Sequence, residues 1–588
     1  MINRQTLLTD LQRLLQRLEA DLLERSESTE IVRVGEALRQ EYEQAKAAAR
    51  TAQNYEDWRS DTITQHAAAW VLSCVFVRFL EDNRLLDPPR ISGQRSAVSD
   101  QHSADGCSRL QLARDEQELY FRSNPRQTDR DYLLAVFDQL KALPATADVF
   151  GDHNPLRQLP DWLSGDAAGE LLRFFQKINA DDGLLIHDFT DPEWNTRFLG
   201  DLYQDLSEAA RKKYALLQTP DFVEAFILDR TLEPALDEFG LTGKRSAVSG
   251  QQSAISDPQS AKNKKLTADS LTAESSFKLI DPACGSGHFL LGAFPRILGR
   301  WQRLEPATGI AVLVQRTLDS IHGVDVNPFA IAIARFRLLL VAMRACGVQR
   351  LADAPAFRLH LACGDSLYHG RQRYQVLDAD WQDEAHYFRS EDTAELRRIL
   401  REGTYHAVVA NPPYITPKDA AANRAYRQLY PRSCHMKYSL SVPFMERLFA
   451  LAIRGTTAAV STARAQGRNL FDDEESSDSP QPTSPGFVGQ ITANSFMKRE
   501  FGKKLIEDYF PTVDLTHVID TSGAYIPGHG TPTVILFGRN RQPLQPTIRT
   551  VLGIRGEPST PEDPAEGRVW TAILQSIDHP SRAATVRE

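Results

Sequence analysis

The chain has 588 residues, of which 42% are hydrophobic and 25% charged, and its net charge is −9. These values are typical of a soluble protein with several domains, and they exclude a uniformly basic protein that coats nucleic acid. The six cysteines contain no Cys-x-x-Cys pair, which excludes a zinc ribbon and favours reduced thiols in the cytoplasm. No apolar run reaches the ~20 residues of a membrane span, and the N-terminus lacks the pattern of a signal peptide.

The first part of the chain is dominated by apolar residues at helical spacing, as in LLTDLQRLLQRLEADLL and AAWVLSCVFVRFLEDNRLL. This periodicity predicts a helical N-terminal domain over residues 1–207. Two related stretches, RSAVSDQHSAD from Arg95 and RSAVSGQQSAI from Arg245, match at eight of eleven positions and lack large apolar anchors. A third, FDDEESSDSPQPTSPG, is acidic and rich in proline and serine. We therefore expect inserts without a fold of their own at residues 91–107, 243–275 and 460–486.

From Phe277 onward, short apolar runs alternate with helical patterns. The strand-like runs are FKLI, IHGVDV, FRLHLAC, YHAVVA, GFVGQITA, DLTHVID and TVILFG, and the helical ones include HFLLGAFPRILGRW, PFAIAIARFRLLLVAMRA, SVPFMERLFALAI and KKLIEDYF. Strand–helix alternation predicts an α/β fold with a mostly parallel, doubly wound sheet. In such sheets, ligands bind beyond the carboxyl ends of the strands.

The first of these strands ends at Asp281 and leads through PACGSG into a helix, with glycine at positions 285 and 287. Glycine permits positive φ and close approach of a ligand to the backbone. The loop has neither the lysine of a P-loop nor the third glycine of a dinucleotide fingerprint. Its opening carboxylate suits a ligand with positive charge and no phosphate, such as S-adenosylmethionine. A tight turn with a capping aspartate is the alternative, and the specific sequence DPACGSG disfavours it.

Two further carboxylates stand where the next strands end. In HGVDVNP, Asp325 is placed to accept hydrogen bonds from a ribose diol. In LACGDSL, Asp365 is placed to accept a hydrogen bond from the adenine amine of the cofactor. Taken alone, each motif also fits an ordinary turn or helix start.

The stretch VVANPPYITP ends another predicted strand with a rigid group of acceptors. Pro412 and Pro413 fix φ and remove two backbone donors, which leaves the Asn411 side-chain oxygen and the Pro412 carbonyl as acceptors. Two fixed acceptors suit an exocyclic amine such as that of adenine, because accepting both hydrogens makes the nitrogen more tetrahedral and able to attack a methyl donor. The ring of Tyr414 is expected to stack on the base. Alone, NPPY also fits a proline turn, but following a strand and DPACGSG it favours methyl transfer.

Six segments in order resemble the motif series of amino-group DNA methyltransferases whose recognition domain follows the catalytic domain: QTP (218–220), DPACGSG (281–287), GVDVNP (323–328), GDS (364–366), NPPY (411–414) and ITANSF (491–496). The N-terminal stretches, such as WVLSCVFVRFLEDNRLLDPPRI, are similar to the PglX-type adenine-specific DNA methyltransferases of BREX, or phage growth limitation, defence systems. That family's chains are longer, so residues 541–588 are expected to be the start of a C-terminal recognition region that is mostly missing.

The resemblance implies a Rossmann-like S-adenosylmethionine-dependent domain over residues 208–540 that methylates the N6 amine of a flipped adenine at a specific site in double-stranded DNA. It also implies cooperation with other phage-defence proteins. Cofactor-binding roles carry over to Thr219, Asp281, Ala283, Gly285, Gly287, Asp325 and Asp365, and catalytic roles to Asn411, Pro412, Pro413 and Tyr414. Thr219 then lies at the methionine end of the cofactor.

Two other functions fit the same motifs. An NPPY corner also suits the amide of a protein glutamine or an RNA base, because the planar nitrogen chemistry is alike. A truncated subunit that binds the cofactor and docks defence partners, without activity of its own, is the second. The Glu-x-Lys of the usual nuclease metal site occurs nowhere in the chain, so we expect no bound metal and no DNA cleavage.

Overall fold

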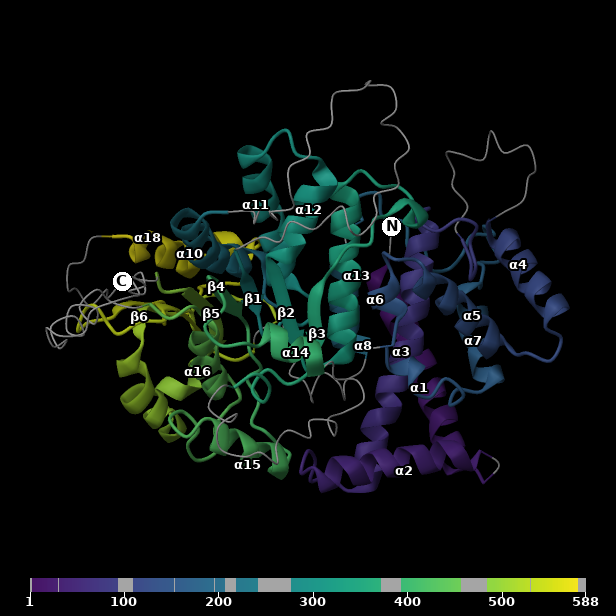
Figure 1. Ribbon diagram of the computed structural model, residues 1–588, viewed down its shortest axis with the longest axis horizontal. Coiled ribbons are helices and arrows are strands. Elements are labelled where there is room, and N and C mark those ends of the chain that lie inside the picture. Colours follow the sequence, from purple (N-terminus) through teal and green to yellow (C-terminus); the bar gives the residue numbers. More distant parts are fainter. Residues whose placement is uncertain are drawn as a thin grey trace, which may run out of the picture.

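The computed structural model describes residues 3–579, except positions 30, 153, 195 and 529 and the segments 94–108, 207–217, 242–276, 372–392 and 456–483. The three predicted inserts lie almost wholly outside the described residues. Figure 1 shows a helical N-terminal part beside an α/β part that is built on one sheet.

The N-terminal part is helical, as the periodicity predicts. Asn3 and Asn54 begin two of its long helices by accepting hydrogen bonds from backbone N–H groups of the first turn. The elements are α1 (Arg4–Glu27), α2 (Val32–Ala47), α3 (Tyr55–Asp82), α4 (Arg109–Ser123), α5 (Asp129–Ala142), α6 (Ala147–Phe150), the 3₁₀ helix η1 (Pro155–Arg157), α7 (Gly165–Phe175) and α8 (Arg197–Leu206).

Helix α3 is the core helix of this part. Among the described residues it is the one helix whose length and composition would suffice to cross a membrane. However, 89% of its most apolar window is buried inside the protein. Its apolar surface is therefore covered by neighbouring helices, including α1 and α7.

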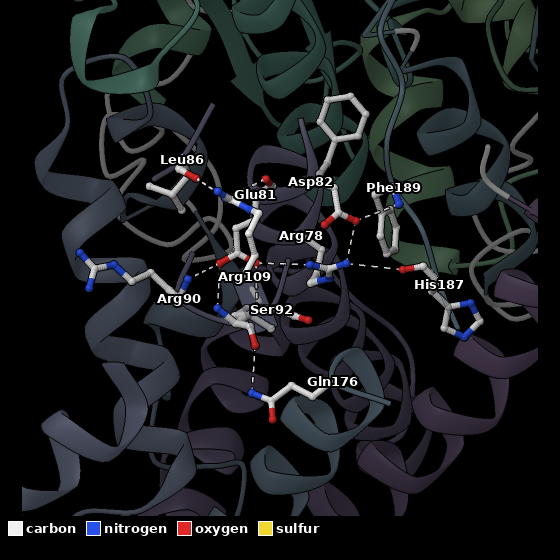
Figure 2. A network of polar contacts seen from close by, with 12 residues as sticks. Arg78, Glu81, Asp82, Leu86, Arg90, Ser92, Arg109, Gln176, His187 and Phe189 are labelled. Carbon is white, nitrogen blue, oxygen red and sulfur yellow. Dashed lines mark hydrogen bonds and ion pairs between the residues drawn. The ribbon is translucent and has the colours of Figure 1, made fainter. Parts of the chain in front are cut away.

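The C-terminal end of α3 carries a buried ionic network (Figure 2). Arg78 pairs with Asp82 at 2.6 Å and with Glu81 at 3.6 Å, and all three side chains are fully buried. The Glu81 carboxylate accepts hydrogen bonds from three consecutive backbone N–H groups, those of residues 90–92. Asp82 accepts another from the backbone of Phe189 at 2.9 Å. The network therefore ties two loops to the end of the core helix.

The α/β part contains one eight-stranded sheet in the order β3-β2-β1-β4-β5-β7-β6-β8. All neighbouring strands are parallel except β7, which is antiparallel to β5 and β6. This confirms the mostly parallel sheet. The strands are β1 (Leu279–Asp281), β2 (Ile321–Asp325), β3 (His360–Cys363), β4 (Ala407–Ala410), β5 (Phe487–Ala493), β6 (Asp514–Asp520), β7 (Thr533–Arg539) and β8 (Arg549–Leu552).

Helices cover both faces of the sheet, so its central strands are buried on both sides. In β4, Ala407 and Val409 belong to one apolar cluster, whereas Val408 and Ala410 belong to the other. The first cluster includes α10 (Asp221–Phe239), α11 (His288–Leu304), α12 (Ile310–Asp319) and α13 (Pro328–Ala345), and the second includes α14 (Thr393–Ile399), α15 (Ala420–Leu429) and α16 (Ser441–Leu451).

The helical part and the sheet share a continuous core. Phe76 of α3 stacks on Phe336 of α13 with ring centroids 4.5 Å apart, and both belong to the first apolar cluster. The predicted boundary at residues 207 and 208 lies outside the described residues and stays a prediction.

One segment differs from the helical pattern of its sequence, and another contains elements that the sequence did not predict. Residues 503–510 form a π-helical turn, η9 (Leu505–Tyr509), which leads into the 3₁₀ helix η10 (Phe510–Thr512), because Pro511 prevents continuation of a helix. Residues 541–588 contain β8, which extends the sheet, and α18 (Arg568–Ile577), whose Trp570 packs edge-on against Phe226 of α10. A separate recognition region from residue 541 onward stays a prediction.

Candidate active site

A cavity lies at the carboxyl ends of β1, β2, β3 and β4, where the strand order reverses between β1 and β4. Such a reversal is where doubly wound sheets bind ligands. The empty space, part of which is open to solvent, measures about 960 Å³. Its lining includes Thr219, Asp281, Ala283, Gly285, Asp325, Asp365, Asn411 and Pro413.

The β1 loop forms the floor of this cavity. Asp281 is buried, and its Oδ1 accepts a hydrogen bond from the backbone N–H of Ala283 at 3.0 Å. Gly285 and Gly287 have φ of +53° and +87°, values that side chains with a Cβ rarely adopt. A Cβ on Gly285 would meet no atom within 4 Å, so this glycine is required by its backbone conformation.

Asp325 closes β2 and holds the β1 loop from the neighbouring strand. Its Oδ2 accepts from the backbone N–H of Gly285 at 2.9 Å, and its Oδ1 accepts from that of Asn327 at 2.8 Å. Asn327 in turn caps α13 through a hydrogen bond from the backbone of Phe329. Asn327 therefore has two roles: its side chain starts α13, and its backbone N–H fixes the carboxylate of Asp325.

Asp365 follows β3 and has a partner that the sequence did not predict. Its Oδ1 accepts from the backbone N–H of Leu367 at 2.9 Å, and its Oδ2 accepts from the hydroxyl of Tyr426 at 2.5 Å. Tyr426 lies on α15 and lines the cavity. The neighbouring Ser366 donates to the carbonyl of Pro282 at 2.6 Å, which links this loop to the β1 loop.

Asn411 follows β4 and reaches the cavity with its side chain held at both ends. Its Nδ2 donates to Oγ1 of the buried Thr219 at 3.1 Å, across 192 residues of sequence. Its Oδ1 accepts from the hydroxyl of Tyr414 at 2.6 Å. Pro413 lines the cavity, whereas Pro412 and Tyr414 are not part of its lining. Burial raises the pKa of Tyr414 above its ordinary value, so this phenol stays a donor at neutral pH.

The cavity concentrates negative charge in a buried place. Burial raises the pKa of Asp281 well above its ordinary value, and the nearby Asp325 raises it further, although the N–H of Ala283 opposes this. Burial also raises the pKa of Asp325 to about 6 against its two backbone hydrogen bonds. A cation bound between these carboxyl groups would favour their ionised forms.

The structure therefore brings together eight of the eleven predicted site residues around one cavity, whereas Gly287, Pro412 and Tyr414 are not among its lining residues. Sequence reasoning missed several lining residues that belong to no motif it used: His288 and Phe289 at the start of α11, Tyr426 on α15, and Leu440 and Phe444 at the start of α16. The sequence GSGHF contained a signal for His288 and Phe289 that was not used, because a ligand bound at the loop also contacts the first turn of the helix that follows.

One group of side chains among the described residues has the geometry of a partial cation site. Ligand atoms of Asp221, Glu224 and His288 lie within 4.8 Å of one another at the first turns of α10 and α11. His288 alone of the three lines the cavity. The expected absence of a metal stays a prediction.

Comparison with known proteins gives matches in sequence and in structure. Residues 319–467 match the family model of the Eco57I restriction-modification methylases. Over 99% of its length the chain is 46% identical to "Adenine-specific methyltransferase PglX" of Streptomyces coelicolor, of which it spans 44%. A putative type II restriction enzyme and methyltransferase of Methanocaldococcus jannaschii is 24% identical over 44% of this chain and 22% of its own length.

Several solved structures cover most of the chain, including the following two. A DrdV–DNA complex covers 93% of this chain and 43% of its own, at 14% identity and a TM-score of 0.44. A nuclease-deletion mutant of the type ISP restriction-modification enzyme LlaGI, in complex with a DNA substrate mimic, covers 93% and 35%, at 10% identity and a TM-score of 0.46. Both TM-scores lie below 0.5, so the fold rests on this chain's own sheet and helices. By its sequence, the chain is similar over nearly its whole length to a PglX-type adenine-specific methyltransferase, of whose length it spans less than half.

Proposed function

We propose that the chain transfers a methyl group from S-adenosylmethionine to the N6 amine of an adenine that is flipped out of double-stranded DNA. One observation carries the proposal: the side chain of Asn411 reaches the same cavity as the carboxylates of Asp281 and Asp325. An acceptor for a target amine therefore stands beside a site suited to a cationic, diol-bearing cofactor. The chain spans 44% of the length of its PglX relative. The activity of that longer protein is therefore proposed for this chain.

The hydrogen-bond acceptors that line the cavity fit S-adenosylmethionine. Asp281 would accept hydrogen bonds from the cofactor's ammonium group, and this positive charge would offset the cost of the buried carboxylates. Asp325 would accept from the ribose hydroxyls and Asp365 from the adenine amine. Each carboxylate oxygen that already accepts one hydrogen bond keeps a second lone pair for this purpose. The bound cofactor supplies a methyl group that its sulfonium charge activates.

Asn411 would act on the target amine. Thr219 fixes the amide nitrogen of Asn411, so the amide oxygen is oriented as an acceptor. In this state the Tyr414 hydroxyl occupies one lone pair of that oxygen. An incoming amine would take the other lone pair or displace the phenol. Accepting hydrogens from the amine favours a tetrahedral nitrogen, and holding it in line with the methyl group supplies much of the rate.

Adenine in a duplex has its amine paired, so the base must leave the stack to reach this cavity. Exposed cations stand at the same edge of the sheet. Lys498, Arg499 and Lys503 follow the end of β5, the strand that pairs with β4 beside Asn411, and all three are exposed. Their charge and exposure support contacts with phosphates at this edge, whereas the chain's net charge of −9 disfavours binding elsewhere.

Within a phage-defence system, methylation of this kind would mark host DNA as self, in the cytoplasm and together with other defence proteins. The sequence similarity to PglX supports this setting.

Transfer of label from tritiated S-adenosylmethionine tests the proposal. The purified full chain is incubated separately with duplex DNA, RNA and a protein extract, and we expect label in DNA as N6-methyladenine. Label in RNA or in protein glutamine, and not in DNA, would show that RNA or protein is the substrate. Cofactor binding without transfer to any substrate would instead support a subunit without activity of its own.

A pH dependence of cofactor binding follows from Asp325. Its pKa of about 6 means that the carboxylate becomes protonated as the pH falls through 6, and a protonated oxygen no longer accepts a ribose hydroxyl. We expect the affinity to be full above pH 7 and to fall by up to about tenfold per pH unit below 6. Calorimetry with S-adenosylhomocysteine between pH 5 and 8 measures this. Asp325→Asn should bind weakly and lose the part of this pH dependence that comes from Asp325, whereas Asp281, whose pKa is also raised, still titrates. An identical profile in both proteins would contradict the role.

A further inference from the structure

The connection between α2 and α3, residues 48–54, reaches from the helical part to α15 and to the loop after β3, each of which contributes other residues to the lining of the cavity. Its backbone turns sharply: Ala49 has φ of +53°, an uncommon conformation for a residue other than glycine. The backbone N–H of Arg50 closes this turn on the carbonyl of Ala45 at 2.9 Å. The strained turn directs Arg50 and Thr51 toward the α/β part, where Figure 1 shows the end of α2 near α15.

The first contact of this connection is with Asp419, the N-cap of α15. Asp419 Oδ1 accepts from the backbone N–H groups of Ala421 and Ala422, at 2.7 and 3.2 Å, and so begins the helix. Its Oδ2 points the other way and accepts from the Thr51 hydroxyl at 3.0 Å and from the backbone N–H of Ala52 at 2.6 Å. One carboxylate therefore joins segments 368 residues apart in the sequence.

The second contact is with the loop after β3. The guanidinium of Arg50 lies over the ring of Tyr368, 4.6 Å from its centroid. Tyr368 and His369 close this loop by donating their backbone N–H groups to the carbonyl of Asp365. The connection therefore touches both the start of α15 and the loop that carries a cavity carboxylate.

Helix α15 and the residue that follows it also hold this loop. Tyr426 donates to the Asp365 carboxylate at 2.5 Å, and Tyr430, one turn later, donates to the carbonyl of Leu367 at 2.7 Å. The helix itself has ten residues, of which only Ala421 and Leu429 are buried. A helix this short is marginal without tertiary contacts, so its N-cap and the contacts to residues 48–54 contribute to how firmly it is held, beside the hydrogen bond from the Tyr438 hydroxyl to the carbonyl of Asn423.

We propose that residues 48–54 form a latch that sets cofactor affinity, with Asp419 as the positioning residue that acts through α15 and Tyr426 on Asp365. This inference rests on the proposed cofactor site. The helical part then contributes to cofactor binding mainly from a distance. Among the described residues, it supplies Gly200 of α8 to the lining of the cavity, and residues 48–54 do not line the cavity. Releasing the latch would lower the fraction of molecules in which Asp365 is correctly placed, and the apparent Kd rises in proportion.

Two substitutions separate the latch from the helix cap. In Asp419→Ser the shorter side chain can still cap α15 but cannot also reach residues 51 and 52, because serine is a good N-cap with one oxygen. Thr51→Val removes the donating hydroxyl at nearly constant shape, and it is the second variant should Asp419→Ser fail to fold. The matched control is Ser164→Ala, which removes the N-cap of α7, a helix of the N-terminal part that does not line the cavity.

Binding of S-adenosylhomocysteine to the full chain is measured by calorimetry. We expect Asp419→Ser to raise Kd about five- to tenfold and Thr51→Val to raise it less, since the Ala52 N–H remains. Ser164→Ala should leave Kd within about twofold of the parent. Methyl transfer at saturating cofactor should change little in Asp419→Ser, so that the effect appears in the KM for the cofactor and not in kcat.

A double-mutant cycle with Tyr426→Phe tests the route. If Asp419 acts through Tyr426, the two substitutions together raise Kd by clearly less than the product of their separate effects. Independent, multiplicative effects would overturn the route, and an unchanged Kd in both Asp419→Ser and Thr51→Val would overturn the latch. A parent chain that binds no cofactor would instead refute the proposed cofactor site, and the latch with it.

Discussion

Replacing Asn411 by alanine is expected to slow methyl transfer by on the order of 10²–10³-fold, as the loss of one preorganised polar group in an active site does. Alanine has no acceptor for the hydrogens of the target amine, so the nitrogen stays planar and poorly nucleophilic. In the proposed arrangement Asn411 contacts the target amine, whereas Asp281 and Asp325 contact the cofactor, so Kd for S-adenosylhomocysteine should stay within about threefold. Single-turnover methylation and calorimetry on the same preparation measure the two quantities.

The matched control is Asn540→Ala. Asn540 donates to the carbonyl of Ala452 at 2.8 Å, and it follows β7 at the opposite edge of the sheet, where Arg539 pairs with Phe487 at the start of β5. Its loss should leave transfer nearly unchanged. A wild-type rate of methyl transfer in Asn411→Ala would contradict the proposed chemistry. Loss of both methyl transfer and cofactor binding would mean that Asn411 supports the fold of the cavity.

The second large effect concerns stability. Arg78→Ala should lower the free energy of unfolding by about 3–5 kcal/mol, because it leaves the Glu81 and Asp82 carboxyl groups buried without their cation. Urea unfolding followed by circular dichroism measures the change. Arg122→Ala is the control: its pair with Glu118 is exposed on both sides and should contribute less than about 1 kcal/mol.

The pH dependence of this effect gives a further check. Burial raises the pKa of Glu81 to about 7 even with Arg78 and three backbone N–H groups opposing the shift. Without Arg78 the pKa rises further, so the carboxyl group is neutral in the folded state over more of the pH range. A raised carboxyl pKa stabilises the fold at low pH, and this contribution is lost as the pH rises through the folded pKa. The cost of Arg78→Ala should therefore be smaller at pH 6 than at pH 8. An equal cost at both pH values would contradict the role of Glu81.

Much of the site was predictable because its residues stand in a fixed relation to the strands. Asp281 closes β1, Asp325 closes β2, and Asn411 and Asp365 follow β4 and β3. In a parallel sheet the carboxyl ends of all strands meet at one edge, so placing the strands also gathers these side chains. Helix α13 begins and ends where PFAIAIARFRLLLVAMRA predicts, since Asn327 caps it and Pro328 suits its first turn.

The remaining parts of the site have no local signal. Tyr426 lies on a short helix with few buried residues, and nothing within AAANRAYRQL reports that its hydroxyl reaches Asp365. The edge strand β8 was not predicted either, since only one of its faces packs on the protein. Residues 503–510 show helical spacing but form π and 3₁₀ turns, because the proline after Phe510 overrides the pattern.

By itself, then, the sequence determined the type of sheet, the order of its motifs and the polar residues that end its strands, since each depends on residues close together in the chain. Only the tertiary structure decided that Thr219 contacts Asn411, that Thr51 and Ala52 contact Asp419, and which helices line the cavity. The contact of Thr219 with Asn411, across 192 residues, depends on how α10 packs against β4 and β5. The contact of Thr51 with Asp419, across 368 residues, depends on how the helical part packs on the α/β part. Spacing along the chain carries no record of such a docking, because it is set by the shapes of two complete surfaces.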